Sequence, residues 1–294
     1  MSVWWGGRSR DDDDVPLAVD RGLLLGDGLF ETILVLGGAA PLLDRHLARL
    51  AASARRLSIE MPTALDATIA RALPALYDHE GRPQRGALRI TVTRGRGRGL
   101  TPPLGPPGLV LCLGALPGVA PGLPAPPVVA CIVDSPRIDP HDPLAGHKVL
   151  SYMGRVAARR AAIDLGADVA LLTTLGGDVC EADAANLFIV SDGVVVTPPL
   201  DTGVLPGITR ARSIESLRHA GARVLERRIA RTEIDPASEV FLTSSLDGVR
   251  PVSFVGARSF AAPGPLALWL AGCISLGADR TEEVMLPAGI RRAE

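Results

Sequence analysis

Lys148 is the residue whose type most directly suggests chemistry, because it is the one lysine among the 31 Lys+Arg residues of the chain. All the other members of that group are arginines. An arginine stays protonated at any workable pH, whereas a buried lysine can lose its proton and form a Schiff base with a carbonyl compound. Lys148 is therefore a candidate covalent nucleophile. The alternative is a lysine that escaped a compositional bias by chance.

Three later segments carry groups that could assist such a nucleophile. Glu181 stands just before the apolar run 184–190, which favours a buried carboxylate over one solvated in a loop. Ile208 and Thr209 follow Pro206-Gly207 and open a predicted helix, where free backbone N–H groups and the helix dipole favour an anion. Ser244 and Ser245 end a predicted strand and suit either a turn or a hydroxyl donor to an anion.

Composition excludes several classes of protein. A net charge of −1 argues against a nucleic-acid partner, and no apolar run is long enough for a membrane span. The four cysteines have no CxxC spacing, which indicates reduced thiols in the cytoplasm and predicts no metal site. We therefore expect a cytoplasmic enzyme with a small-molecule substrate, without a signal peptide.

The region 101–127 is rich in proline and glycine and separates two parts of the chain. We predict a small N-terminal α/β domain over residues 1–116, a linker over 117–127, and a larger C-terminal domain over 128–294 that carries the lysine. The predicted elements mix both periodicities, so the expected class is α+β, or mixed α/β. They are helices over 43–57, 149–165 and from about 206, an apolar helical segment over 265–276, strands over 88–93, 109–113, 128–133, 169–174 and 239–245, and a hairpin of 186–190 with 194–197.

Seven short runs, in order, resemble the class IV aminotransferase family of pyridoxal-phosphate (PLP) enzymes, also called fold type IV. The resemblance extends from about Val19 to Val252 and therefore implies a two-domain fold type IV architecture with PLP as cofactor. The runs are Asp20-Arg21-Gly22, Gly26-Asp27-Gly28-Leu29-Phe30-Glu31-Thr32, His46-Leu47-Ala48-Arg49-Leu50, Pro143-Leu144-Ala145-Gly146-His147-Lys148, residues 177–188, Thr197-Pro198-Pro199 and 205–210.

The resemblance assigns roles to individual residues. Lys148 would hold PLP and then move protons, and Glu181 would keep the pyridine nitrogen protonated. The cofactor phosphate would be bound by Arg49, Ile208, Thr209, Ser244 and Ser245. By itself, Arg49 would be one more arginine on a solvated helix face.

The substrate would be bound by Phe30 and by an arginine of the Arg94-Gly95-Arg96-Gly97-Arg98 run. Arg98 is the better match for a substrate carboxylate than Arg96, although the run is one residue shorter than the family pattern, which leaves both open. The family also implies a homodimer.

Three functions are open at this point, two of them implied by the resemblance. The Pro143–Lys148 run and the Arg-Gly repeat resemble 4-amino-4-deoxychorismate lyase, which forms 4-aminobenzoate and pyruvate for folate precursor synthesis. Ser151 stands where the lyase pattern often has Asn, so the alternative is an aminotransferase for a D-amino acid, a branched-chain amino acid or an (R)-amine. A third interpretation is a binding or regulatory domain without PLP, against which Lys148, Glu181 and Arg49 argue together.

Overall fold

The computed structural model describes residues 2–5, 8–10, 20–97, 99–103, 105–120, 122–274 and 285–293. They form two compact units, one made of Met1–Gly118 with His147–Tyr152, the other of Val119–Gly146 with Met153–Glu294. Of the predicted site residues, Arg98 lies outside the described residues. The domain boundaries expected from the sequence, at 117–127, remain a prediction.

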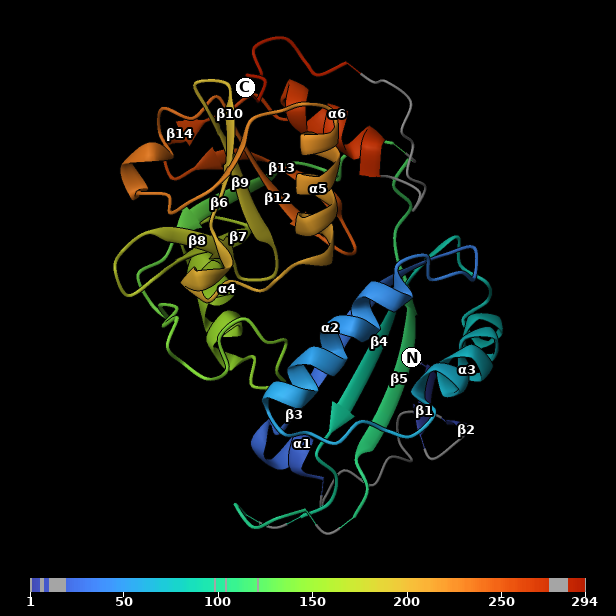
Figure 1. The fold of residues 1–294 in the computed structure, drawn as a ribbon. Helices are drawn as coiled ribbons and strands as arrows, with labels where there is room; N and C mark the ends of the chain where they lie inside the picture. Colours follow the sequence, from blue (N-terminus) through green and yellow to red (C-terminus); the bar gives the residue numbers. More distant parts are fainter. Residues whose placement is uncertain are drawn as a thin grey trace. The chain divides into compact units, whose positions relative to one another are not determined.

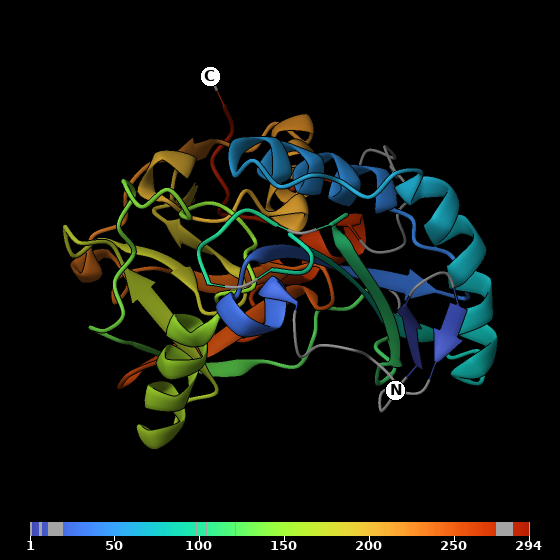
Figure 2. The same ribbon diagram turned by 90° about the horizontal axis from the view of Figure 1, so that it is seen from below.

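The first unit is built on an antiparallel sheet with the strand order β2-β1-β5-β4-β3 (Figure 1). Helices α2 and α3 cover one face of this sheet (Figure 2). The elements are β1 (Ser2–Trp5), β2 (Arg8–Arg10), α1 (Arg21–Leu25), β3 (Gly28–Leu36), α2 (Leu43–Arg56), α3 (Leu65–His79), β4 (Arg85–Thr93) and β5 (Gly108–Ala115).

The core of the first unit follows from the alternation of its strands. In β4, Leu88, Ile90 and Val92 are fully buried, while the residues between them face the other side of the sheet. In α2, Leu50 and Ala54 are four residues apart and pack into the same core, which confirms the apolar stripe predicted there.

The predicted helix over 149–165 is wrong at its start, because α4 begins at Met153. Residues before it run extended along the edge strand β3. The Phe30 N–H donates to the Lys148 carbonyl at 2.9 Å, and the Leu150 N–H donates to the Gly28 carbonyl at 2.9 Å. Lys148 is therefore held by strand pairing on β3 and does not stand at the mouth of a helix.

The second unit is also mixed, with strands outnumbering helices. Its helices are α4 (Met153–Asp164), α5 (Ile208–His219) and α6 (Pro265–Ile274), with short 3-10 turns at Leu200–Thr202 and Arg231–Glu233. Its strands are β6 (Val128–Ile132), β7 (Val169–Thr173), β8 (Val179–Ala182), β9 (Asn186–Ser191), β10 (Val194–Thr197), β11 (Val224–Glu226), β12 (Glu239–Ser244), β13 (Gly248–Val255) and β14 (Arg258–Ser259).

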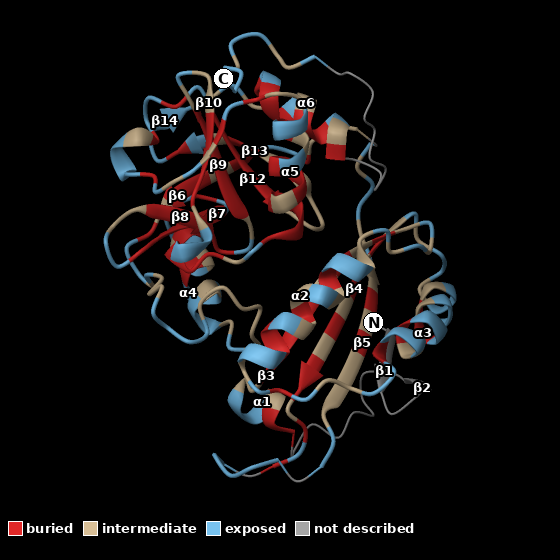
Figure 3. Cartoon of the chain, viewed as in Figure 1, coloured by how far each residue is buried: buried red, intermediate tan, exposed pale blue. Residues whose placement is uncertain are grey.

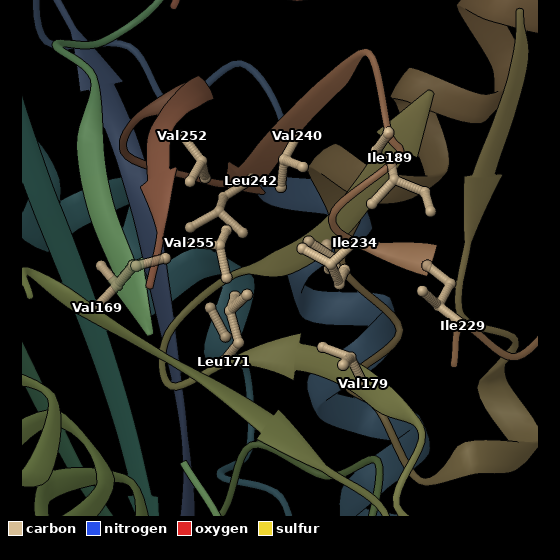
Figure 4. Close-up of a cluster of buried hydrophobic side chains, with 14 of the residues drawn as sticks. Val169, Leu171, Val179, Ile189, Ile229, Ile234, Val240, Leu242, Val252 and Val255 are labelled. Carbon is tan, nitrogen blue, oxygen red and sulfur yellow. The ribbon is translucent and has the colours of Figure 1, made fainter. Parts of the chain in front are cut away.

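Six strands of the second unit close into a ring, because β8 pairs with both β7 and β9. The order around the ring is β8-β9-β12-β13-β6-β7. Apolar side chains fill its interior, among them Leu171, Ile189 and Leu242 (Figure 4). The strands are buried while the helices outside them expose one side (Figure 3). The hairpin β9–β10, turned at Asp192-Gly193, is confirmed.

Helix α6 belongs to a core rather than to an exposed surface. Leu266, Leu270 and Ile274 are buried in a cluster with residues of α5 and β12. None of the helices in the described part of the chain combines the length and apolar character that a bilayer span requires.

Candidate functional site

Lys148 lies on the first unit among aromatic side chains. Its Nζ is 4.4 Å from the ring centroid of Phe30 and 5.8 Å from that of Tyr152. The two rings meet edge to face, with centroids 5.3 Å apart and planes at 78°. Since Val149 packs against the core cluster, the alternation of the extended segment places Lys148 on the face of the sheet that carries Phe30.

A second cation, Arg89, also lies over the Phe30 ring. The guanidinium carbon of Arg89, on β4, lies 3.8 Å from the ring centroid, and its Nε donates to Thr91 Oγ1 at 3.2 Å. No carboxylate of the described residues forms an ion pair with it, and partial burial lowers the pKa of Arg89. An unpaired, half-buried guanidinium beside Lys148 is suited to binding an anionic ligand.

Arg49 is not on a solvated face, because its side chain is only 9% exposed. Its Nε donates to Glu31 Oε1 at 2.8 Å and its Nη2 to Oε2 at 2.6 Å, a two-pronged ion pair. Glu31 points from β3 into the core face, where His46 Nδ1 lies 2.7 Å from Oε2. This pair fixes the Arg49 side chain in one orientation.

The charge of Glu31 is stabilised by its partners. Burial alone would raise its pKa, but the hydrogen bonds and positive charges of His46 and Arg49 outweigh burial and hold the pKa below the ordinary value of 4.5. Next to Lys148, His147 Nδ1 is 2.9 Å from Ser53 Oγ. Burial, and then the charge of Arg56, lower the pKa of His147, which favours its neutral form at neutral pH.

Glu181 lies in the second unit at the point where the strand ring closes. It is 1% exposed and pairs across the ladder with Asn186. Arg155 Nη2 donates to its Oε1, and Oε2 accepts from the Leu205 N–H at 3.1 Å and from Asn186 Nδ2 at 3.5 Å. The carboxylate is therefore buried and held in place, which fits a partner for a protonated ring nitrogen.

The predicted anion site at Ile208 and Thr209 is the first turn of α5. Gly207 is the N-cap, and no side chain caps this turn. A Cβ on Gly207 would lie 1.9 Å from Asn186 Oδ1, while Asn186 Nδ2 donates to the Leu205 carbonyl at 2.9 Å. Asn186 thus connects the start of α5 to Glu181.

Ser244 and Ser245 stand at the end of β12, and Thr243 of that strand pairs with Asn186. The Ser244 hydroxyl donates to Asp247 Oδ2 at 3.3 Å and accepts from the Asp247 N–H at 3.1 Å, so it takes part in a turn. The second unit therefore brings Glu181, the first turn of α5 and the Ser244-Ser245 pair to one end of its sheet.

The loop arginines differ in what the structure describes. Arg96 is exposed, and its backbone forms a bridge with Asp20. Arg98 lies outside the described residues. The sequence alone does not single out Arg89, Tyr152 or Asn186, since the significance of each depends on neighbours from other parts of the chain. Tyr152 had one signal, as one of only two tyrosines in the chain.

Each unit by itself carries groups that suit PLP chemically. An amine can bind the cofactor carbonyl, a buried carboxylate can accept from the ring nitrogen, and an uncapped helix start with an oriented arginine can bind a phosphate. These groups are Lys148, Glu181, the first turn of α5 and Arg49.

Comparison with known proteins identifies the family. The family model for amino-transferase class IV matches residues 28–255. The aminodeoxychorismate lyase of Vibrio harveyi is 32% identical over 251 residues, covering 83% of this chain and 88% of that protein. The D-alanine aminotransferase of Bacillus licheniformis is 29% identical over 288 residues, covering 90% and 93%. The crystal structure of the branched-chain aminotransferase of Thermoproteus uzoniensis superposes with a TM-score of 0.82 at 25% identity, covering 92% of each chain.

The chain belongs to the class IV aminotransferase family. It has the mixed α+β, fold type IV architecture of these enzymes, and it is an enzyme whose cofactor is pyridoxal 5′-phosphate. The expectations of fold class, family, enzyme and cofactor are confirmed. The family contains both lyases and aminotransferases, so it does not by itself define the reaction.

Proposed function

We propose that this protein is a 4-amino-4-deoxychorismate lyase, which releases pyruvate and forms 4-aminobenzoate for folate precursor synthesis. The observation that carries the proposal is Arg89, an unpaired half-buried cation on the same ring as Lys148. The lyase substrate carries two carboxylates, one on the ring and one on the enolpyruvyl group. Arg89 and a loop arginine, Arg96 or Arg98, offer one cation to each.

The proposed roles follow from the chemistry of each side chain. Bound PLP supplies an electron sink to the carbon that bears the substrate amine. Lys148 would hold the cofactor and, as a free amine, would remove the ring proton at that carbon. The bond between the ring carbon and the enolpyruvyl oxygen breaks, pyruvate leaves after gaining a proton, and the ring becomes aromatic. The reaction is redox-neutral and needs no second keto acid.

The remaining groups bind and orient. Glu181 accepts the hydrogen bond of the protonated ring nitrogen, and Phe30 contacts the substrate. The phosphate is bound by Arg49, Ile208, Thr209, Ser244 and Ser245. We further propose that the enzyme is a cytoplasmic homodimer. The four free cysteines, Cys112, Cys131, Cys180 and Cys273, support a reducing compartment.

The test follows both products of the PLP-loaded protein with 4-amino-4-deoxychorismate and no keto acid. Equimolar 4-aminobenzoate and pyruvate over many turnovers are expected. An Arg89→Met variant should lose most of the rate while keeping its PLP, because the substrate carboxylate loses its cation and no proposed PLP contact is removed. Wild-type protein that releases neither product contradicts the lyase proposal.

The second candidate is an aminotransferase for a D-amino acid, a branched-chain amino acid or an (R)-amine with a 2-oxo acid acceptor. Ser151 favours it, because its short side chain is turned to the backbone, where Oγ donates to the Gly26 carbonyl at 3.5 Å. Amino-group transfer from D-alanine or a branched-chain donor to 2-oxoglutarate, without release of 4-aminobenzoate, would establish this activity instead.

A further inference from the structure

Two charged residues of the N-terminal motifs, Arg21 and Asp27, have no role in the proposed reaction, yet both are largely buried. Their side chains are 8% and 17% exposed. Arg21 Nε donates to Asp27 Oδ2 at 2.8 Å, and Arg94 Nε donates to the same carboxylate at 2.9 Å and 3.0 Å. One carboxylate therefore joins an arginine of α1 to the arginine that follows β4.

Arg21 also holds both ends of the 95–101 loop, the segment that carries the Arg-Gly repeat. Its backbone N–H donates to the Gly95 carbonyl at 2.9 Å. Its Nη1 donates to the carbonyls of Gly99 at 2.7 Å and Thr101 at 2.8 Å. Arg21 thus connects the two ends of the loop. The ammonium of a lysine lacks the planar fork of N–H donors that this arrangement uses.

Arg94 ties the start of this loop to the rest of the first unit. Its backbone N–H donates to the Asp27 carbonyl at 3.0 Å. Its Nη2 donates to the Leu57 carbonyl at 3.0 Å, and its Nη1 donates to the Ser58 carbonyl, just beyond the end of α2. We call Arg21, Asp27 and Arg94 the loop clamp.

The residues that follow Asp27 pair with the segment that carries Lys148. Directly after Asp27, the Gly28 carbonyl accepts from the Leu150 N–H, and the Phe30 N–H donates to the Lys148 carbonyl, both at 2.9 Å. Asp27 therefore stands between the loop and the strand pairing that holds Lys148.

The glycines of the repeat fit this arrangement. A Cβ on Gly97 would lie 2.8 Å from Arg21 Cδ and 3.4 Å from its Nη1, and Arg21 is bonded too completely to move aside freely. A Cβ on Gly95, which has φ +88°, would lie 2.3 Å from the Pro106 carbonyl oxygen. By contrast, nothing lies within 4 Å of a Cβ on Gly105.

We propose that the loop clamp positions the described loop residues, 95–97 and 99–101, relative to Lys148, so that the loop meets a substrate carboxylate at a defined place. The clamp residues are positioning residues and do not touch the substrate. The inference rests on the proposed function, since it assumes a carboxylate-bearing amine as substrate. It assigns a role to the motif residues Arg21 and Asp27, and to the glycine of the repeat at position 97.

The first experiment compares Asp27→Asn with Asp44→Asn, a matched change at an exposed site on α2. In the PLP-loaded enzyme, Asp27→Asn should raise KM for 4-amino-4-deoxychorismate by roughly tenfold or more, because small misplacements of binding groups are costly. The kcat should change less, and the PLP dissociation constant should stay at the wild-type value. Arg21→Lys should not restore a low KM, since it lacks the fork that spans the loop. A PLP dissociation constant that rises as much as KM would overturn the proposal.

A second readout does not depend on activity. Amide hydrogen exchange over residues 95–101 should be faster in Asp27→Asn than in wild type and in Asp44→Asn. If the wild-type protein releases no 4-aminobenzoate, the proposed function fails, but exchange still decides whether the clamp holds the loop. In that case KM is measured with the amino donor that the enzyme does use. Unchanged exchange and unchanged KM together would overturn the clamp.

A second variant, in the loop itself, tests the clamp independently in case Asp27→Asn does not fold. Gly97→Ala should displace Arg21 and reproduce the rise in KM and the faster exchange, whereas Gly105→Ala should change neither. The double variant Asp27→Asn with Gly97→Ala should be little worse than either alone, because both disrupt one unit. Fully multiplicative effects on KM would contradict a shared clamp.

Discussion

The Nζ of Lys148 lies beside the rings of Phe30 and Tyr152 because the backbone of residues 148–150 pairs with β3. Its residue type stands out in the sequence as the one lysine among the arginines. Arg89 and Glu31 were missed because each owes its role to a partner from another element. Cross-strand register decides that Arg89 contacts Phe30, and helix packing decides that Glu31 pairs with Arg49. Neither relation can be read from local pattern.

Replacing Glu181 by Gln should separate cofactor binding from catalysis. Gln retains an acceptor for the Leu205 N–H but cannot hold the ring nitrogen protonated by charge. PLP should remain bound, and turnover should fall by roughly a hundredfold, in line with the loss of one charge-stabilising group. Product release and PLP content measure this, with Glu215→Gln, on the exposed side of α5, as the control. Undiminished turnover would show that Glu181 is not the partner of the ring nitrogen.

Glu31 should contribute a pH-dependent part of the stability. Since its folded-state pKa is held below 4.5, its ionised form stabilises the fold above that value, and this contribution is lost as the pH falls through the folded-state pKa. Glu31→Gln should therefore unfold about 1–3 kcal/mol more easily than wild type at neutral pH. The difference should shrink in acid.

Urea unfolding at a series of pH values measures this difference. Glu60→Gln, at an exposed position, is the control. A gap between wild type and Glu31→Gln that stays constant from neutral to acid pH would contradict the assigned role of the Glu31 charge.

Among the helices and strands, the regular periodic segments were predictable, whereas the start of α4 and the closure of the strand ring were not. The alternation of β4, the stripe of α2 and the β9–β10 hairpin each depend on local periodicity, and all three are confirmed. The start of α4 was misplaced because residues 147–151 form strand bonds with β3, which override a helical pattern. The ring closure between β8 and β9 depends on the Glu181–Asn186 pair and has no sequence period.

Gly207→Ala should disturb the candidate site through Asn186, which pairs with Glu181 where β8 and β9 meet. The added Cβ would lie 1.9 Å from Asn186 Oδ1, so Asn186 must turn and give up its bond to the Leu205 carbonyl. The first turn of α5 would then shift, and PLP affinity should fall by about tenfold.

Gly272→Ala, on the exposed side of α6, provides the matched control. Its Cβ would meet nothing closer than 4.0 Å, and alanine in a helix should be neutral or slightly stabilising. PLP titration of both variants is the measurement, and equal affinity in both would contradict the proposed link between Asn186 and the cofactor site.

At the scale of the molecule, fold class and cofactor were predictable because the motifs recur in order, while the reaction was not. The four cysteines are free, and burial raises the pKa of the Cys131, Cys180 and Cys273 thiols. We therefore expect the melting temperature to be the same with and without dithiothreitol, and these three thiols to react slowly with a thiol reagent in the native protein. A fall in melting temperature on reduction would indicate a disulfide and contradict this account.

Locating the cofactor linkage tests most directly whether Lys148 is the residue that holds PLP. The holoenzyme is reduced with borohydride, digested and examined by mass spectrometry. Because Lys148 is the only lysine, the chain offers no other side-chain amine for a Schiff base. We expect a phosphopyridoxyl group on Lys148, its absence from Lys148→Arg, and no turnover by that variant. A holoenzyme without the adduct on Lys148, or a Lys148→Arg variant with wild-type turnover, would contradict it.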